Sequence, residues 1–526
     1  MTLSKRIVQI YTVATYCVWF INLGTIATMD ITKLPFASFR DTKIWEEYIS
    51  EKLSPFEKDL TNYLKYWYIE SQENSSAYPS QGLLKTPFDS LPYKQRGMLP
   101  LQEMLRILRI RQYFLEIFNH PERIVALKKI QKKPFVAPVK VSSHVMEENI
   151  AKGLAISISD LGIRVVGSQR ERVSRKFRLN HGPFVRLGKY ARSILVGSAM
   201  PDAWGSVYAI STMAQCLSLV GVPRNGPFND IDRQVALARE AFVALEESEV
   251  LIGRSQYQKQ FLLEQWKHNI MGVLDADPHK ALVRAKALHK VGVRTFRVYS
   301  PEPGLSVVRT VAALRKAFGD EVEIFAGQVV DVTQAQQIEA AGADGLYIGI
   351  GGGGRCITGV RSGSVIDWPI LLWELRGEIS IPVIVEGGAS DHIATTLALG
   401  ASGIGVSSAV AGGTVESPGG MLYFTDSTGE YFKPYGGEAS ARTKYLDNKM
   451  LPFQMPSFVE GETRSAYMNS LPYGVPTIPF HVHNLTEDTI LSLVFRSVED
   501  IEQLQSLDPS PIRRNTPQGT WQQNTH

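Results

Sequence analysis

Between residues 130 and 425, short apolar runs alternate with stretches in which apolar residues recur at helical spacing. Helical stretches, including 279–290, 304–318 and 333–341, follow most of these runs. Eight successive strand-then-helix units predict a (β/α)8 TIM barrel. The runs that indicate strands are Phe135–Val139, Gly162–Gly167, Ile270–Leu274, Thr295–Tyr299, Glu323–Val329, Gly345–Ile350, Pro382–Val385 and Gly403–Val406.

The spacing of these units is regular from residue 270 onward and irregular before it. Residues 168–268 would form a long insertion between the second and third strands. That segment holds a further apolar run, Ile194–Gly197, so the choice of the first two strands stays open. A doubly wound open sheet is the competing architecture.

The flanking regions have their own patterns. Residues 1–130 are predicted to form an N-terminal helical extension, in which 101–118 is an amphipathic helix packed on the main domain. The barrel domain is expected over 131–485. A C-terminal helix and a tail should occupy 486–526, and the polar residues from Pro509 to His526 are expected to be disordered.

An uncharged run, Ile7–Thr28, follows Lys5 and Arg6 and is long enough to cross about 30 Å of hydrocarbon. It contains Gln9, Asn22 and several threonines, which weaken insertion. A spanning segment and a buried or interfacial helix are both open. A span with its basic flank inside would place the rest of the chain outside the cell, so we favour a packed or peripheral segment.

Composition narrows the function classes. The 526 residues are 44% hydrophobic and 21% charged, as in ordinary globular proteins. A net charge of +4 is too small to indicate a nucleic-acid binder. Cys17, Cys216 and Cys356 lie far apart without a CxxC pair, which argues against a disulfide framework or a structural zinc site and favours the reducing cytoplasm.

The segments after the last predicted strands carry the candidate chemistry, because functional groups of such barrels lie at the C-terminal strand ends. The segment Gly349–Gly359 (GIGGGGRCITG) combines a glycine run with Cys356 and Thr358. Glycines let backbone amides approach a ligand, and a thiol on such a loop is accessible for nucleophilic attack. A lone cysteine is more often a small buried residue, but a tetraglycine loop buries a thiol poorly.

Two further strand ends are rich in small polar residues. Glu386, Gly387 and Gly388 follow one strand, and Ser407 and Ser408 follow the next. Small residues at these two positions commonly bind phosphate, and an adjacent carboxylate can accept hydrogen bonds from ribose hydroxyls. Each element alone could be a tight turn, but their joint position favours a nucleotide site.

Several stretches resemble the IMP dehydrogenase/GMP reductase family. GADGLYIGIGGGGRCITG (342–359) resembles the cysteine loop of the family, and the segment beginning PVIVEGGASDH at residue 382 resembles its phosphate region. YFKPYGGEAS (431–440) and VEGET (459–463) resemble the segments that flank its flap, here 436–465. Residues 168–268 show no clear CBS pattern, although the family often carries a CBS pair there.

The resemblance implies roles for individual residues. The catalytic group would comprise Cys356 as the nucleophile that attacks C2 of a purine nucleotide, Thr358 beside it, and Arg442 and Tyr445 in the flap. Ser300, Gln328 and Glu416 would lie at the cofactor, with Glu416 matching an acidic residue that takes part in ammonia release in the reductase. A monovalent cation such as K+ would sit at Gly351, Gly353 and Cys356. The substrate would contact Gly354, Arg355, Glu386, Gly387, Gly388, Ser407, Ser408, Tyr435, Gly437 and Glu460.

The chain also departs from the family pattern. Glu386 stands where the family has Asp, Gly354 where it has Ser, and Gln328 where it has Asn. Tyr299-Ser300-Pro301 replaces an Asp-Ser-Ser stretch, which changes the nicotinamide site. Arg355 offers a cation in place of the lost serine contact.

These features together predict an enzyme that oxidises IMP to XMP with NAD. A GMP reductase-like, NADPH-dependent reaction is one alternative. A barrel that binds a purine nucleotide without turnover is the other. The resemblance further implies a homo-tetramer, and the small net charge argues against a nucleic-acid partner.

Overall fold

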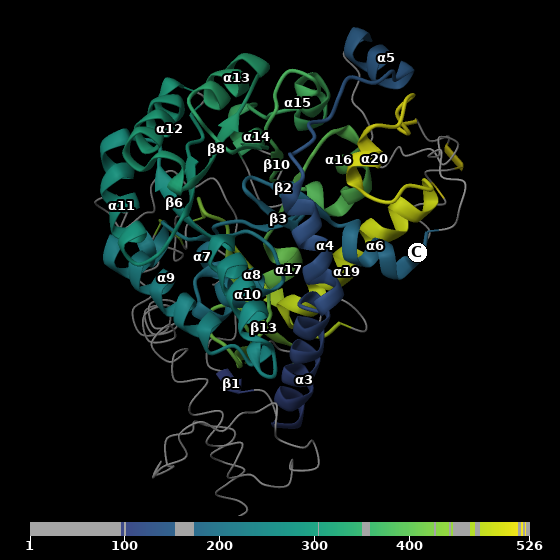
Figure 1. The fold of residues 1–526 in the computed structure, drawn as a ribbon. Coiled ribbons are helices and arrows are strands. Elements are labelled where there is room, and N and C mark those ends of the chain that lie inside the picture. The colour runs from purple at the N-terminus through teal and green to yellow at the C-terminus, as the bar shows by residue number, and fades with distance from the viewer. Residues whose placement is uncertain are drawn as a thin grey trace, which may run out of the picture.

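The computed structural model describes a barrel with helical and β additions (Figure 1). The residues it describes are 96–98, 101–152, 173–302, 304–349, 358–425, 428–440, 443–444, 463–468, 474–513, 517–518 and 521.

Eight parallel strands close into a barrel in the order β10-β11-β4-β5-β6-β7-β8-β9. Helices surround it on the outside (Figure 1), which confirms the predicted (β/α)8 architecture and excludes the open sheet. The strands are β4 (Leu195–Gly197), β5 (Val220–Val222), β6 (Ile270–Asp275), β7 (Thr295–Tyr299), β8 (Glu323–Val329), β9 (Gly345–Ile348), β10 (Val383–Val385) and β11 (Gly403–Val406).

The structure corrects the first two strands. Phe135–Val139 has no regular secondary structure, and Gly162–Gly167 lies outside the described residues. The first strands are β4 and β5, so residues 168–268 contribute the first part of the barrel and are not an insertion within it. The apolar run Ile194–Gly197 noted in the sequence contains β4, whereas β5 has only three residues and lies just after a buried helix, so its run does not stand out in the sequence.

Most of the outer helices begin after a residue whose side chain caps the helix. The side chain of Asp277 accepts from Lys280 N at 2.8 Å, and Asp331 accepts from Gln334 N at 2.7 Å. Such caps satisfy amide groups that have no partner within the helix. The outer helices of the barrel are α8 (Val207–Gln215), α9 (Ile231–Glu246), α10 (Gln256–Asn269), α11 (Pro278–Lys290), α12 (Leu305–Phe318), α13 (Val332–Ala340), α15 (Trp368–Leu375) and α16 (Ile393–Leu399).

A hairpin of β2 (Phe184–Leu187) and β3 (Tyr190–Ser193) covers the N-terminal end of the barrel. Leu187 from this hairpin joins Val196, Phe325 and Tyr347 in a fully buried cluster. The barrel is therefore closed by side chains at this end, and its opposite end is left for function.

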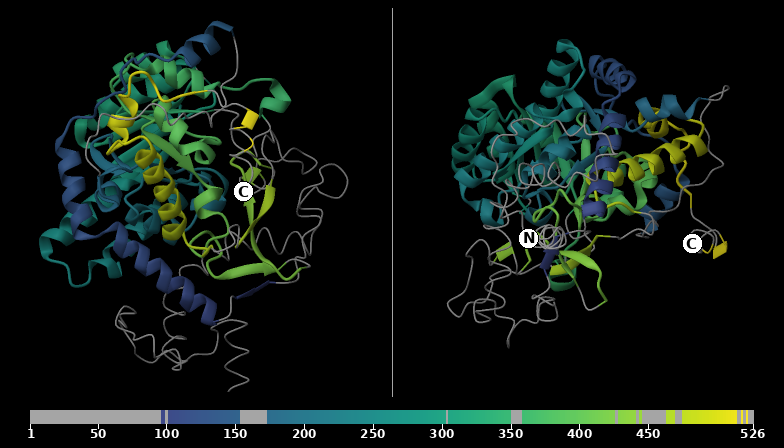
Figure 2. Two further views of the ribbon diagram at one scale, coloured as in Figure 1. Left: turned by 90° about the vertical axis from the view of Figure 1, so that its right-hand side faces the viewer. Right: turned by 90° about the horizontal axis from the view of Figure 1, so that it is seen from below.

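The N-terminal extension packs against the C-terminal helices (Figures 1 and 2). Helix α3 (Leu101–Phe118) covers the residues predicted for the amphipathic helix and contacts α19 (Ile478–Phe495), with the rings of Phe114 and Phe480 5.5 Å apart. The other helices of these regions are α4 (Pro121–Lys132), α5 (His144–Lys152), α6 (Arg175–His181) and α20 (Ile501–Gln505).

A second sheet has the order β1-β12-β13-β14 and is antiparallel throughout. Its first strand comes from the N-terminal extension, and β13 and β14 flank the predicted flap. Figure 2 shows its light-green strands beside the helical layer of the barrel. The strands are β1 (Arg96–Met98), β12 (Leu422–Thr425), β13 (Tyr431–Gly436) and β14 (Thr463–Tyr467).

Two further expectations about the ends of the chain need correction. The expected boundary at 485 falls inside α19, and the first part of the tail is packed, with Ser510 N donating to Ser142 O at 2.9 Å and Ile512 fully buried. Within the described part of the chain, no helix is long and apolar enough to cross a membrane. The run Ile7–Thr28 lies outside that part.

Candidate functional site

The site residues predicted from sequence fall into two groups. The structure describes Ser300, Gln328, Thr358, Glu386, Gly387, Gly388, Ser407, Ser408, Glu416, Tyr435 and Gly437. Outside the described residues lie Gly351, Gly353, Gly354, Arg355, Cys356, Arg442, Tyr445 and Glu460.

Glu386 follows β10 at the C-terminal end of the barrel, where it meets Arg297 of β7. Arg297 donates from both terminal nitrogens to the two carboxylate oxygens, at 2.8 and 2.5 Å. Gln328 of β8 adds a longer hydrogen bond from Nε2 to Glu386 Oε2 at 3.3 Å. The structure thus joins two predicted site residues through an arginine that the sequence analysis did not select.

Arg297 reaches this position because side chains alternate along a strand. Thr295 donates to Glu323 near the N-terminal end of β7, and Arg297 and Tyr299 follow two and four residues later on the same face. The Arg297 guanidinium lies 4.0 Å from the centre of the Tyr347 ring. Burial alone would lower the pKa of Arg297, but the Glu386 carboxylate raises it above its usual value, so Arg297 remains a cation.

Two left-handed glycines follow Glu386. Gly387 and Gly388 have φ values of 81° and 85°, a conformation that residues with a side chain rarely adopt. The neighbouring strand end carries Ser407, whose hydroxyl contacts that of Ser198 after β4, and Ser408 begins the short helix α17 (Ser408–Ala411). Small residues and hydroxyls thus meet at the ends of β10, β11 and β4, and a phosphate site there stays a prediction.

The end of β13 is attached to the same face of the barrel. Asp202, in α7 (Pro201–Trp204) after β4, accepts from Gly436 N at 2.7 Å, and the Tyr435 hydroxyl lies 3.0 Å from the sulfur of Met200. Gly437 O accepts from Ser440 N at 2.9 Å. Tyr435 and Gly437, predicted to contact the substrate, therefore lie next to the β4 end.

Glu438 and its partners were not singled out by the sequence analysis. Its carboxylate accepts from Asn225, which follows β5. Burial raises the pKa of Glu438 above its usual value, and the nearby Arg224 opposes this shift. Arg224 in turn pairs with Asp275 at the end of β6, with an N–O distance of 2.7 Å. For Arg297 and Asp275 the sequence did hold a signal, because each is a charged residue within or at the end of an apolar strand, in TFRVY and IMGVLD.

The other predicted residues are placed as follows. Thr358 begins α14 (Thr358–Ser362), directly after the undescribed cysteine loop. The Ser300 hydroxyl follows β7 and accepts from Glu302 N at 3.0 Å. Gln328 is 3% exposed, and its Oε1 has no hydrogen-bond partner among the described residues. This buried acceptor is available for a ligand.

Glu416 lies in a different environment. Its side chain is 2% exposed, and it contacts Thr477 and accepts from Ile478 N at 3.1 Å, at the start of α19. It also pairs with Arg111 of α3, with an N–O distance of 3.3 Å. These contacts connect the N-terminal extension, the loop after β11 and α19, while the predicted role of Glu416 at the cofactor stays a prediction.

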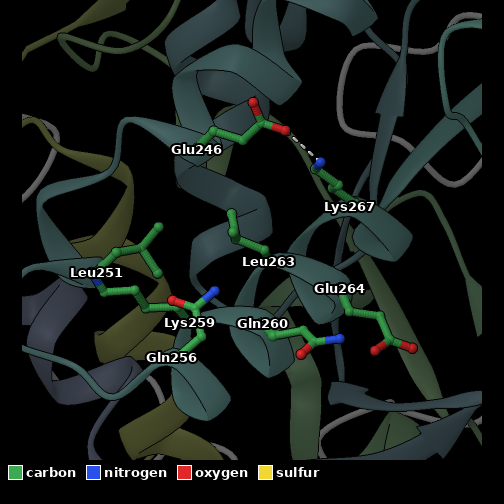
Figure 3. Close-up of a pocket in the computed structure, with 8 residues that line it drawn as sticks. All are labelled: Glu246, Leu251, Gln256, Lys259, Gln260, Leu263, Glu264 and Lys267. Carbon is green, nitrogen blue, oxygen red and sulfur yellow. Dashed lines mark hydrogen bonds and ion pairs between the residues drawn. The ribbon is translucent and has the colours of Figure 1, made fainter.

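A separate cavity of about 530 Å³ lies in the outer helical layer (Figure 3). Figure 3 shows the ion pair between Lys267 and Glu246, 2.6 Å long, at one side of it. None of its residues comes from a barrel strand, and in the described ranges no cluster of His, Cys, Asp and Glu could hold a metal ion. The cavity is lined by Glu246, Leu251, Gln256, Lys259, Gln260, Leu263, Glu264 and Lys267.

Comparison with known proteins gives a consistent result. A model of the IMP dehydrogenase / GMP reductase domain matches residues 206–476. Inosine-5'-monophosphate dehydrogenase 1 of Arabidopsis thaliana is 34% identical over 178 residues, which cover 32% of this chain and 34% of the relative. The Nitrosopumilus maritimus inosine-5'-monophosphate dehydrogenase is 36% identical over 140 residues, 26% of this chain and 28% of the relative.

The inosine-5'-monophosphate dehydrogenase of Cryptosporidium parvum is 29% identical over 184 residues, covering 32% of this chain and 45% of the relative. The chain thus aligns with less than half the length of each of these relatives. The domain match nevertheless covers half of the chain and includes most of the barrel and the segments that flank the flap. This chain belongs to the IMP dehydrogenase / GMP reductase family.

Proposed function

We propose that this chain is an oxidoreductase that binds a purine nucleoside monophosphate at the C-terminal end of the barrel and oxidises IMP to XMP with NAD. The observation that carries the proposal is the convergence of Glu386, Gln328 and Ser407, from three different strand ends, on one face of the barrel. The carboxylate suits ribose hydroxyls, and the buried amide suits a base or a carboxamide. The glycines and serines offer backbone amides and hydroxyls that suit a phosphate.

In this proposal Cys356 forms a covalent bond to C2 of the purine as a thiolate. Loss of hydride from C2 leaves a thioimidate, and attack by water releases XMP and the free thiol. The nicotinamide cofactor supplies the hydride acceptor when it is bound. Covalent catalysis makes C2 tetrahedral and electron-rich, and so a better hydride donor.

The residues after β7 and β8 fit a nicotinamide group. The Oε1 of Gln328, which has no partner among the described residues, can accept from a carboxamide. Ser300 is adjacent, because Gln328 N donates to Ser300 O at 3.0 Å. Gln328 and Ser300 would orient the cofactor, and Tyr299 would exclude water where the family has an aspartate.

A nucleotide-binding barrel without turnover is the second candidate. The observation that favours it is Tyr299 at the nicotinamide side, where the family has an aspartate. A GMP reductase-like reaction is tested in the same experiment.

The decisive assay incubates the full-length protein with IMP plus NAD, or with GMP plus NADPH, and follows the absorbance of the reduced nicotinamide. We expect NADH formation with IMP and its loss in Cys356→Ala, with nucleotide affinity retained. Consumption of NADPH with GMP would favour the reductase. A rise in melting temperature with nucleotide but no reaction would support the binding barrel and overturn the proposed oxidation.

A further inference from the structure

The longer side chain of Glu386 is accommodated by residues on two other strands. A β-carbon on Gly405 of β11 would lie only 2.7 Å from Glu386 Cγ, so the additional methylene of Glu occupies space that a side chain at 405 would fill. On the other side, the Arg297 guanidinium meets both carboxylate oxygens. The local structure thus fits glutamate at this position, where the family has aspartate.

Arg297 itself has little freedom. It is 4% exposed, and its guanidinium lies 4.0 Å from the ring centre of Tyr347 and 4.9 Å from that of Tyr299. Tyr347 is fully buried, so it provides a fixed surface for the planar group. A planar fork packed against aromatic rings sets both the direction and the plane of a carboxylate, which a lysine ammonium cannot do.

The pairing also determines which part of Glu386 remains for a ligand. A carboxylate has about four acceptor positions, two on each oxygen. Oε2 receives hydrogen bonds from Arg297 and Gln328, whereas Oε1 receives one from Arg297. Its side chain is 14% exposed, and among the described residues nothing else donates to Oε1, so one acceptor position there is open to a group arriving at the barrel mouth.

We propose that Arg297 is a positioning residue that fixes Glu386 so that its Oε1 accepts a hydrogen bond from one ribose hydroxyl of the nucleotide. This inference rests on the proposed function, and it assigns a role to a residue outside the motifs that identify the family. It narrows the expectation that the carboxylate accepts hydrogen bonds from the ribose hydroxyls. It also implies that aspartate would serve less well here than glutamate, because the shorter arm would move away from the Arg297 fork.

The test measures the affinities of IMP, 2'-deoxy-IMP and 3'-deoxy-IMP by calorimetry for the unaltered protein and for Glu386→Asp and Arg297→Lys. The unaltered protein should prefer IMP to one deoxynucleotide by about tenfold, the size of one hydrogen bond to a charged group, and should barely distinguish IMP from the other. Both variants should lose this preference while still binding IMP. A purely structural role of Arg297 would weaken all three nucleotides alike.

A third variant protects the test from misfolding. Arg297→Met combined with Glu386→Gln removes both charges of the pair together, so neither is left buried without its partner. The double variant should fold and bind IMP but should no longer prefer IMP to either deoxynucleotide, and a retained preference overturns the inference. Unchanged preference in Arg297→Lys and Glu386→Asp, or equal use of both hydroxyls by the unaltered protein, overturns this inference alone. Failure of the unaltered protein to bind IMP or GMP overturns the proposed function as well.

Discussion

Arg192 and Glu323 form a two-point ion pair inside the N-terminal end of the barrel, with N–O distances of 2.8 and 2.6 Å. Their side chains are 0% and 1% exposed. The pair joins β3 of the covering hairpin to the first residue of β8, and Lys189 N and Thr295 add hydrogen bonds to the same carboxylate. It therefore connects the hairpin to the barrel at the end opposite the proposed nucleotide site.

We predict that Arg192→Met lowers the free energy of unfolding by about 3–5 kcal/mol, because the buried Glu323 carboxylate loses its counter-charge. Urea denaturation measures the loss. The control is Lys176→Ala, which removes the pair between Lys176 and Glu122, whose side chains are 69% and 48% exposed. That change should cost less than about 1 kcal/mol. Equal losses in the two variants would contradict a structural role for the buried pair.

His268 makes stability depend on pH. Burial lowers its pKa to about 4, although the Glu323 carboxylate opposes this shift. An unfolded chain has a histidine pKa of about 6.5 and so binds more protons between pH 6.5 and 4, which favours unfolding there. The folded state is therefore fully stable with respect to His268 above about pH 6.5, where the ring is neutral in both states, and it loses stability as the pH falls towards 4.

We therefore expect His268→Gln to make stability less dependent on pH over this window, by at most about 3 kcal/mol in total. The measurement is the urea midpoint at a series of pH values for both proteins. Glu323 and the other titrating groups are common to both, so the difference between the two curves isolates His268. Parallel curves would show that His268 is not the group responsible.

Gly349 limits the geometry at the start of the cysteine loop. Its φ is 121°, and a β-carbon there would lie 1.9 Å from Glu386 O. We predict that Gly349→Ala lowers the melting temperature much more than Gly253→Ala, where φ is also positive at 72° but no atom lies within 4 Å of the added carbon. The second change should cost only the backbone strain, about 1–2 kcal/mol. Thermal unfolding of both variants checks this, and similar shifts would mean that the contact with Glu386 O is easily relieved.

The sequence was sufficient for most of the barrel. From residue 270 onward each predicted strand matches an observed one within two residues, because long apolar runs such as Glu323–Val329 alternate with capped helices. The start of the barrel could not be located in this way. Leu195–Gly197 and Val220–Val222 are strands because their neighbours pair with them, and periodicity cannot reveal a three-residue strand among buried helices.

The candidate site was predictable only in part, for a different reason. Glu386 was visible because it stands at a strand end beside two glycines. Arg297 was not, since an arginine inside an apolar strand gives no sign of whether it faces the barrel interior or the helices. Its partner is 89 residues away, and only closure of the barrel brings the two side chains together.

Glu416 provides the last prediction, which separates a structural role from a chemical one. Its carboxylate meets Arg111 of α3 and the first residues of α19, and its backbone oxygen accepts from Ser206. Glu416→Gln keeps the shape, removes the charge opposite Arg111, which is 17% exposed, and replaces one of the two accepting oxygens with an NH2 donor. We expect a loss of about 1–3 kcal/mol in stability and faster proteolytic cleavage near α3. Turnover per folded molecule should be largely unchanged. Arg111→Met should reproduce the loss of stability. If Glu416→Gln instead abolishes turnover at unchanged stability, Glu416 acts on the ligand, as the resemblance to the reductase implies.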